Sequence, residues 1–425
     1  MEQLSKCAVA CSRLVPKVAE FRSGHFRLGP ELRRLLGVRE VGAIEAIVFY
    51  GARVLEALTA EALTAVKIEA SVNVFSNLQT LEQYSLLTAG ALHSAHALRR
   101  LGNAARHIQE ELNSDHAQLA LALTEQTLAW FFLLDLPKKP RLERLCENES
   151  SLALATDESL RGAMANAEKL GRTWHSGWPA LRIEQGPALL RTGQTAAIIA
   201  ELWINHGEEA DLAAAGELLG DALKRHPDNL RLQQLRMLHA SRSGDLAAAS
   251  KMIDDLMDRN SDDDETVGIA AGVYKRMWKQ DPAARNWLAK SHKLYLTGWK
   301  KSKGQNAYLG INAATTSLLL GRAEESWKLA AEIEQLLTGR NDRLRECGCS
   351  SIEPDYWTQV SLAESLLLEG KLDEAATAYH AAFQRFSCDR GNIRVTISQM
   401  HAIAEARGLS EDEFARLPKE PPPAS

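Results

Sequence analysis

An arginine and a histidine seven positions apart are the most distinctive chemical pair in this sequence. Residues 98–107 read Leu-Arg-Arg-Leu-Gly-Asn-Ala-Ala-Arg-His, so Arg100 precedes His107 by seven positions. On a continuous helix this spacing puts two side chains on one face. A guanidinium keeps its charge and can stabilise negative charge on phosphate. An imidazole can move a proton near neutral pH. The pair therefore suits phosphodiester chemistry.

Three neighbours extend this candidate site. Asn103 would orient the phosphate or the imidazole, or would simply form the turn of a Gly102–Asn103 break in the helix. Arg99 and Arg106 are candidates for substrate binding. In the structural alternative, His107 caps or packs beside the same break. The spacing alone is weak evidence, because the sequence repeats it in Arg285–His292 and Arg394–His401.

The elements that would position these residues are helices. Ala- and Leu-rich stretches dominate the chain and strand signals are nearly absent, which predicts an all-α protein. Apolar residues at helical spacing predict helices over 43–66, 70–82, 88–100 and 115–134, with Asp115 as N-cap of the last. We expect a four-helix bundle within residues 28–136, preceded by an extension over 1–27. Pro137 and Pro140 end the last helix, so we place the domain boundary at 136–150.

The bundle segment resembles a known superfamily. Ala-Arg-Val-Leu-Glu-Ala-Leu at 52–58, then Leu78 and Leu81, then Leu101-Gly102-Asn103 and His107 are similar to the HEPN superfamily, in its Leu-Gly-Asn…His branch. The resemblance implies a metal-independent ribonuclease site made by an arginine and a histidine, with one cleft built from two protomers. Arg99 and Arg100 both fit the motif arginine. We prefer Arg100, because its separation from the histidine falls in the usual range.

The rest of the chain predicts a tetratricopeptide-like α-solenoid over 150–415, with a disordered tail at 416–425. Residues 366–382 carry the spacing of a tetratricopeptide repeat (TPR), and the turn glycines Gly244, Gly321 and Gly370 mark degenerate copies. Stacked helix pairs of this kind bury a continuous core and leave a concave surface for a partner.

One part of the repeat segment is more specific. The stretches 263–278, 308–322 and 355–370 resemble the TRAFs-binding domain of apoptosis-signal-regulating kinases. The resemblance implies a sensing or scaffolding role without kinase activity, since no kinase segment is present. Four residues of these stretches are candidates for a ligand or partner surface, with core packing as the alternative: Tyr308, Asn312, Tyr356 and Trp357.

Composition narrows the function classes. The chain has 425 residues and a formal net charge of −5, so an RNA contact would need a local basic patch. Six cysteines without a leader, and no apolar run of about 20 residues, predict a cytoplasmic protein with free thiols and no membrane segment. We find no phosphate-binding glycine loop, nucleophile elbow or zinc signature, so we expect no cofactor and no metal.

Together these features predict a metal-independent RNA endonuclease, an effector or toxin of bacterial antiviral defence. It would act on RNA as a homodimer, and its repeat domain would bind a protein partner or a small nucleotide signal. The alternative from another class is a non-catalytic signalling scaffold, or a nucleotide-signal sensor, that acts through protein–protein interaction.

Overall fold

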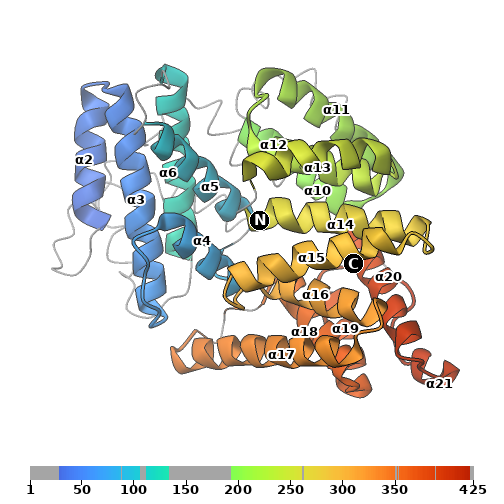
Figure 1. Ribbon diagram of the computed structural model, residues 1–425. Coiled ribbons are helices and arrows are strands. Elements are labelled where there is room, and N and C mark those ends of the chain that lie inside the picture. Colours follow the sequence, from blue (N-terminus) through green and yellow to red (C-terminus); the bar gives the residue numbers. More distant parts are fainter. Residues whose placement is uncertain are drawn as a thin grey trace. The chain divides into compact units, whose positions relative to one another are not determined.

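The computed structural model describes residues 28–87, 89–105, 112–133, 193–260, 263–349, 352, 354–387 and 389–421. Within these residues every long regular element is an α-helix and no strand is present (Figure 1). The predicted all-α fold class is confirmed. None of the described helices is long and apolar enough to cross a membrane.

The described chain divides into two units. Unit 1 holds residues 28–133 with 193–198, 342–349 and 352, and unit 2 holds residues 199–341 and 354–421. Helices α10 and α17 contribute residues to both units. We treat each unit by itself.

Helix α3 is the central helix of unit 1. It packs against all four of its neighbours, while α5 also packs against α4 and α6. The unit has five helices in its described N-terminal part, one more than the sequence predicted: α2 (Leu28–Glu40), α3 (Ile44–Ala65), α4 (Val74–Gln83), α5 (Ala89–Ala104) and α6 (Ser114–Leu133). The unexpected helix is α2, which buries Leu28, Leu32 and Leu35 completely. Their spacing of four and three residues puts them on one face.

Helix α5 corrects the predicted break at Gly102–Asn103. The helix continues through both residues and ends at Ala104. A Cβ atom at Gly102 would lie 2.2 Å from the Cβ of Ala52 on α3. The glycine therefore permits close contact between α3 and α5, and does not interrupt the helix. Arg100 lies within α5, whereas His107 lies outside the described residues.

Unit 2 is a series of helical hairpins. From α11 to α16 each helix packs against the next, and α18 packs against α19. The first helices of the pairs also make contact: α12 with α14, α14 with α16, α16 with α18, and both α16 and α18 with α20. The helices are α10 (Gly193–His206), α11 (Glu209–Arg225), α12 (Leu230–Arg242), α13 (Leu246–Asn260), α14 (Asp264–Gln280), α15 (Arg285–Lys301), α16 (Ala307–Leu319), α17 (Ala323–Glu346), α18 (Tyr356–Glu369), α19 (Leu372–Arg385), α20 (Arg390–Ala406) and α21 (Glu411–Phe414).

The hairpins of unit 2 use recurring local signals. Gly244, Gly321 and Gly370 have φ angles of 86°, 84° and 90°, so all three predicted turn glycines adopt the left-handed backbone that glycine favours. Four first helices begin with a side chain that accepts from a backbone N–H two or three residues into the helix: Asn229, Asp263, Asn306 and Asp355. These caps satisfy amides that have no partner inside the helix.

The core of unit 2 lies between these hairpins. Trp203, Tyr295, Tyr379 and Phe383 are among its largest fully buried side chains. Leu417, which the sequence placed in the tail, is only 2% exposed and joins this core.

Candidate functional site

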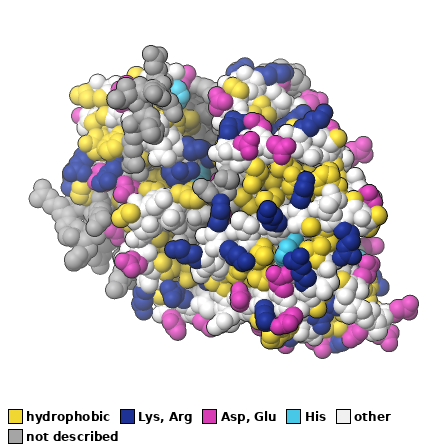
Figure 2. Space-filling view, in the orientation of Figure 1, with side chains coloured by type: hydrophobic (Ala, Val, Ile, Leu, Met, Phe, Trp, Pro, Cys, Tyr) yellow, Lys and Arg dark blue, Asp and Glu magenta, His cyan; other side chains and the backbone are white. Residues whose placement is uncertain are grey.

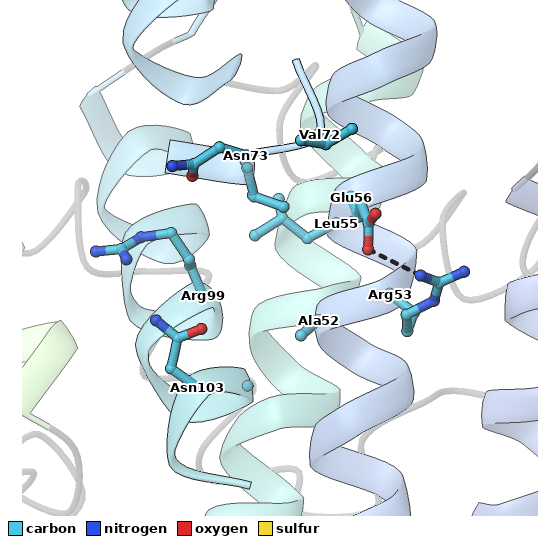
Figure 3. Close-up of a pocket in the computed structure, with 10 residues that line it drawn as sticks. Ala52, Arg53, Leu55, Glu56, Val72, Asn73, Arg99 and Asn103 are labelled. Carbon is cyan, nitrogen blue, oxygen red and sulfur yellow. Dashed lines mark hydrogen bonds and ion pairs between the residues drawn. The ribbon is translucent and has the colours of Figure 1, made fainter. Parts of the chain in front are cut away.

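A pocket lies beside the Leu-Gly-Asn motif in unit 1. Its volume is about 370 Å³, and it is bounded by α3, α5 and the loop before α4. Figure 3 shows Arg99 and Asn103 projecting from successive turns of α5, with Asn73 above them and Glu56 on α3. The lining residues are Ala52, Arg53, Leu55, Glu56, Val72, Asn73, Val74, Arg99, Gly102 and Asn103.

Helix α5 gives the pocket a cation and an amide. Arg99 and Asn103 are four residues apart, so they lie on the same face. The Arg99 guanidinium lies 5.0 Å from the centre of the Phe75 ring, and this stacking fixes its position. Arg99 is half-buried, whereas Asn103 is exposed. Arg100 is half-buried and does not line the pocket. Of the two candidate arginines, Arg99 thus faces the pocket.

The opposite wall carries an ion-pair network. Arg53 donates to Glu56 and to Glu31 of α2, both at 3.1 Å. Glu31 is 7% exposed and also accepts from Arg34 at 2.8 Å. The hydrogen bond that Arg53 donates to Glu31 raises the pKa of Arg53 above its ordinary value. Arg53 and Glu56 thus form an ion pair within α3, and the added bond to Glu31 connects α3 to α2.

The loop at the pocket mouth is held by two asparagines. Asn77, only 2% exposed, accepts from the Ser71 amide at 2.7 Å and donates to the Ser71 carbonyl at 2.9 Å. Asn73 caps α4 by accepting from Phe75 N at 2.9 Å. Val72, between Ser71 and Asn73, is 98% exposed. This loop places Asn73 above Arg99 in the view of Figure 3, and both side chains line the pocket.

The pocket can bind an anion, since a guanidinium and two amides face it. Proton transfer requires a further group. The two remaining sequence candidates, Arg106 and His107, lie outside the described residues, although they follow Asn103 by only three and four positions. The sequence missed Asn73 and Val72, because no local motif links this loop to α5.

In unit 2 the four predicted surface residues lie on neighbouring helices. Tyr308 and Asn312 are on α16, and Tyr356 and Trp357 begin α18. The Tyr308 and Trp357 rings meet edge to face at 5.9 Å. Tyr356 is 4% exposed and its hydroxyl bonds to Thr396 at 2.7 Å, whereas Trp357 is 36% exposed. Tyr356 and Asn312 are therefore mainly internal, and Tyr308 and Trp357 are more accessible.

The sequence missed a cation that lies among these residues. Lys275 Nζ donates to Asn312 Oδ1 at 2.6 Å and to Gln399 Oε1. The signal that points to it is a Lys275–Arg276 dipeptide that follows the mostly buried run 267–273 of α14 after one residue, Tyr274. On the face drawn in Figure 2, lysine and arginine side chains are interspersed with acidic ones and do not gather in one patch.

A known protein family is similar to part of unit 2. Residues 211–320 match the family model "Tetratricopeptide Repeats-Sensor". This part of the chain is thus similar to tetratricopeptide repeats, as the repeat spacing predicted. No curated protein matches the chain. The likenesses to the HEPN superfamily and to the TRAFs-binding domain stay predictions.

Three solved structures are similar to the chain. A thermophilic TPR protein from Thermus thermophilus aligns with 51% of this chain and 100% of its own, at 18% identity and a TM-score of 0.35. The APC/C hetero-tetramer Cut9–Hcn1 aligns with 92% of this chain and 87% of its own, at 10% identity and a TM-score of 0.31. The TPR domain of P58(IPK) aligns with 90% of this chain and 99% of its own, at 13% identity and a TM-score of 0.21.

Proposed function

We propose that the protein is a two-part RNA endonuclease in which unit 1 cleaves RNA and the TPR-like domain senses the trigger. The pocket carries this proposal. Arg99 and Asn103 face a cavity of about 370 Å³, and the motif histidine follows Asn103 by four residues. A charged guanidinium beside amide groups suits a phosphodiester, whose negative charge grows during in-line attack.

The proposed reaction needs no metal. The 2′-hydroxyl of the RNA loses its proton to His107 and attacks the adjacent phosphorus. The bond from phosphorus to the 5′-oxygen of the next nucleotide breaks, and that oxygen takes a proton. The products are a 2′,3′-cyclic phosphate and a 5′-hydroxyl. Arg99 stabilises the extra charge on the phosphate oxygens, and Asn103 orients the phosphate.

A second protomer would supply the second proton-transfer group. One His107 can act as base or as acid, whereas cleavage benefits from both at once. A symmetric dimer provides two copies without further sequence. We expect a homodimer by light scattering at micromolar concentration, with the motifs of the two protomers facing one another. A monomer that cleaves RNA at full rate would contradict the shared cleft.

The test is RNA cleavage by full-length protein in a chelator, with analysis of the product ends. We expect cyclic-phosphate ends from the wild type and no cleavage by His107→Ala, with circular dichroism unchanged between them. His380→Ala is the matched control, because His380 is exposed on α19 of unit 2. Cleavage only with added metal, or full cleavage by His107→Ala, would contradict the mechanism.

A non-catalytic scaffold is the second candidate, and the family match at 211–320 favours it. In that case both units bind partners, and unit 1 uses its pocket to hold an anionic segment of a partner. The two candidates differ in one observable. A scaffold leaves RNA intact, and the His107→Ala variant then has the same effect in cells as the wild-type protein.

A further inference from the structure

Several cations lie on two neighbouring helices of unit 2, α12 and α14. Arg242 ends α12, and Lys275, Arg276 and Lys279 follow one another along α14. Arg276 Nη1 donates to Ser241 Oγ at 2.8 Å, and Ser241 immediately precedes Arg242. Burial, followed by the charge of Arg276, lowers the pKa of Arg242 to about 10. Arg276 thus reaches α12 at the residue next to Arg242, and both guanidinium groups stay charged at neutral pH.

The partners of these cations are uncharged. Arg242 donates to the Ile204 carbonyl at 2.9 Å and to Asn392 Oδ1 at 2.7 Å. Its Nε is buried and has no hydrogen-bond partner among the described residues. Lys279 donates to Ser398 Oγ at 2.9 Å. Since Asn392, Ser398 and the lysine-bound Gln399 all belong to α20, neutral groups of one helix hold three of the cations in place.

The carboxylates nearby do not balance this positive charge. Glu201 and Glu265 are both bound by Arg231, at 2.9 Å each. Glu364 is 4% exposed and accepts from Gln399 Nε2 at 2.6 Å. Burial raises the pKa of Glu364 and lowers the pKa of Lys275, so burial works against the charge of both. Arg242 and Arg276 form no ion pair with a carboxylate among the described residues, and such guanidinium groups are costly to bury. An anion from solution would offset that cost.

Tyr308 adds a neutral donor to the same cluster. Burial raises the pKa of Tyr308 to about 12, while the charges of Arg276 and Arg242 act on its hydroxyl in the opposite sense. The hydroxyl is therefore protonated at neutral pH. The Tyr308 ring lies against α14 at Gly268, where an added Cβ would be 2.8 Å from Tyr308 Cε1, and Arg276 follows Gly268 by eight residues on the same face of α14. Its ring packs edge to face on Trp357, which is the most accessible aromatic of the group.

We propose that Arg242, Arg276 and Tyr308 form a binding site for a small phosphate-bearing anion. Guanidinium forks match phosphate oxygens in geometry and charge. The site rests on the sensing role proposed above, of which it would be the ligand-receiving part. Phosphate groups alone, or phosphate groups with a base that stacks near Trp357, are two sources of this chemistry.

The experiment is calorimetric titration of full-length protein with inorganic pyrophosphate and, separately, with ATP, in chelator at constant ionic strength. We expect saturable binding and a higher melting temperature with pyrophosphate. Affinity for ATP well above that for pyrophosphate would assign a contribution to the base, and equal affinities would assign binding to phosphate alone. Either result supports the site.

Arg276→Gln should weaken binding by about tenfold or more, since a charge-assisted hydrogen bond contributes about 1.5–3 kcal/mol. Lys328→Gln is the matched control: it removes one charge from the exposed face of α17, where Lys328 pairs with Glu324. Arg276→Lys keeps the charge without the fork and should bind with intermediate affinity.

No saturable binding of either ligand to wild-type protein would overturn the site, and so would equal binding by folded Arg276→Gln. Protein that binds pyrophosphate but cleaves no RNA would contradict the nuclease alone. Protein that cleaves RNA but binds neither anion would overturn this site alone.

Discussion

Gly102 shows how one residue positions the pocket of unit 1. Its missing side chain lets α5 approach α3 at Ala52, where an added Cβ would come within 2.2 Å of the alanine Cβ. Arg99 and Asn103 flank the glycine on the same helix, so the distance between the helices sets their distance from Leu55 and Glu56 across the pocket. The glycine therefore affects both packing and the shape of the site.

Gly102→Ala should destabilise the protein by about 1–3 kcal/mol, because an inserted methyl overpacks a close helix contact. The neighbour offers a compensating change. Ala52→Gly removes the clashing methyl at a cost of about 1 kcal/mol in helix propensity. Urea denaturation of the two single variants and of the double variant measures their coupling. We expect the double variant to be more stable than the sum of the single effects predicts. Strict additivity would contradict the contact.

At this scale the sequence predicted one wall of the pocket and missed the other. Arg99 and Asn103 stand in a short motif and were predicted as site residues. Asn73 and Val72 reach the same pocket from a loop that precedes Arg99 by more than 20 residues. No local pattern encodes that meeting, because it depends on how α3, α4 and α5 pack.

The positions of these helices were predicted more accurately than the residue that caps α6. The predicted helix 43–66 corresponds to α3 (Ile44–Ala65), and 115–134 corresponds to α6 (Ser114–Leu133). The predicted cap Asp115 was wrong. Asn113 accepts from the His116 amide at 3.2 Å, so the cap lies two residues earlier, and Asp115 lies in the first turn. Asparagine and aspartate both cap well, so the sequence alone could not choose between them.

Gly370 and Gly339 provide opposite tests of the helical hairpins. Gly370 ends α18 with φ +90°, and an added Cβ would lie 2.8 Å from Arg407 Nη2. Gly370→Ala should therefore cost about 1–2 kcal/mol, the penalty of left-handed backbone for alanine. Gly339 lies within α17 with nothing within 4 Å of an added Cβ. Gly339→Ala should stabilise by about 0.5–1 kcal/mol. Thermal denaturation compares the two, and a stable Gly370→Ala would contradict the turn geometry.

For the whole molecule, a buried histidine, His292, and a half-buried one, His239, predict how stability responds to pH. Burial lowers the pKa of His292 below its ordinary value of 6.5, and burial has the same effect on His239. His292 is 4% exposed. It bonds through Nδ1 to Thr316 at 3.2 Å, and its Nε2 accepts from Arg322 at 3.2 Å. Glu325, 3.8 Å from Nε2, favours the proton, but burial and the charges of Arg322 and Lys300 oppose it.

The direction of the change in stability with pH follows from proton binding. Below pH 6.5 the unfolded chain binds a proton at His292 more readily than the folded chain does, so stability is lost as the pH falls. The free energy of unfolding should therefore decrease between about pH 7 and pH 5. His292→Gln should reduce that decrease, with His239 accounting for part of the rest, whereas His380→Gln on the exposed face of α19 should not. A pH profile of His292→Gln identical to that of the wild type would contradict this assignment.

The helical hairpins of unit 2 were easier to predict than the meeting of its cations with α20. Repeat spacing indicates helical hairpins, because turn glycines and small packing residues recur along the sequence. The cations of α12 and α14 meet neutral side chains of α20 more than 100 residues later. These side chains meet only because α20 contacts α12 and α14. The repeat pattern in the sequence does not predict that contact.

The most direct measurement of the central claim is cleavage of one defined RNA in chelator by wild-type protein, Arg99→Ala and Arg100→Ala at equal concentration. Arg99 faces the pocket and Arg100 does not, although they are adjacent and carry the same charge. We predict cleavage by the wild type and a loss of about 10²–10³-fold in rate for Arg99→Ala, the cost of one donor to developing negative charge. Arg100→Ala should lose much less. Intact RNA with wild-type protein, or equal rates for wild type and Arg99→Ala, would contradict the account.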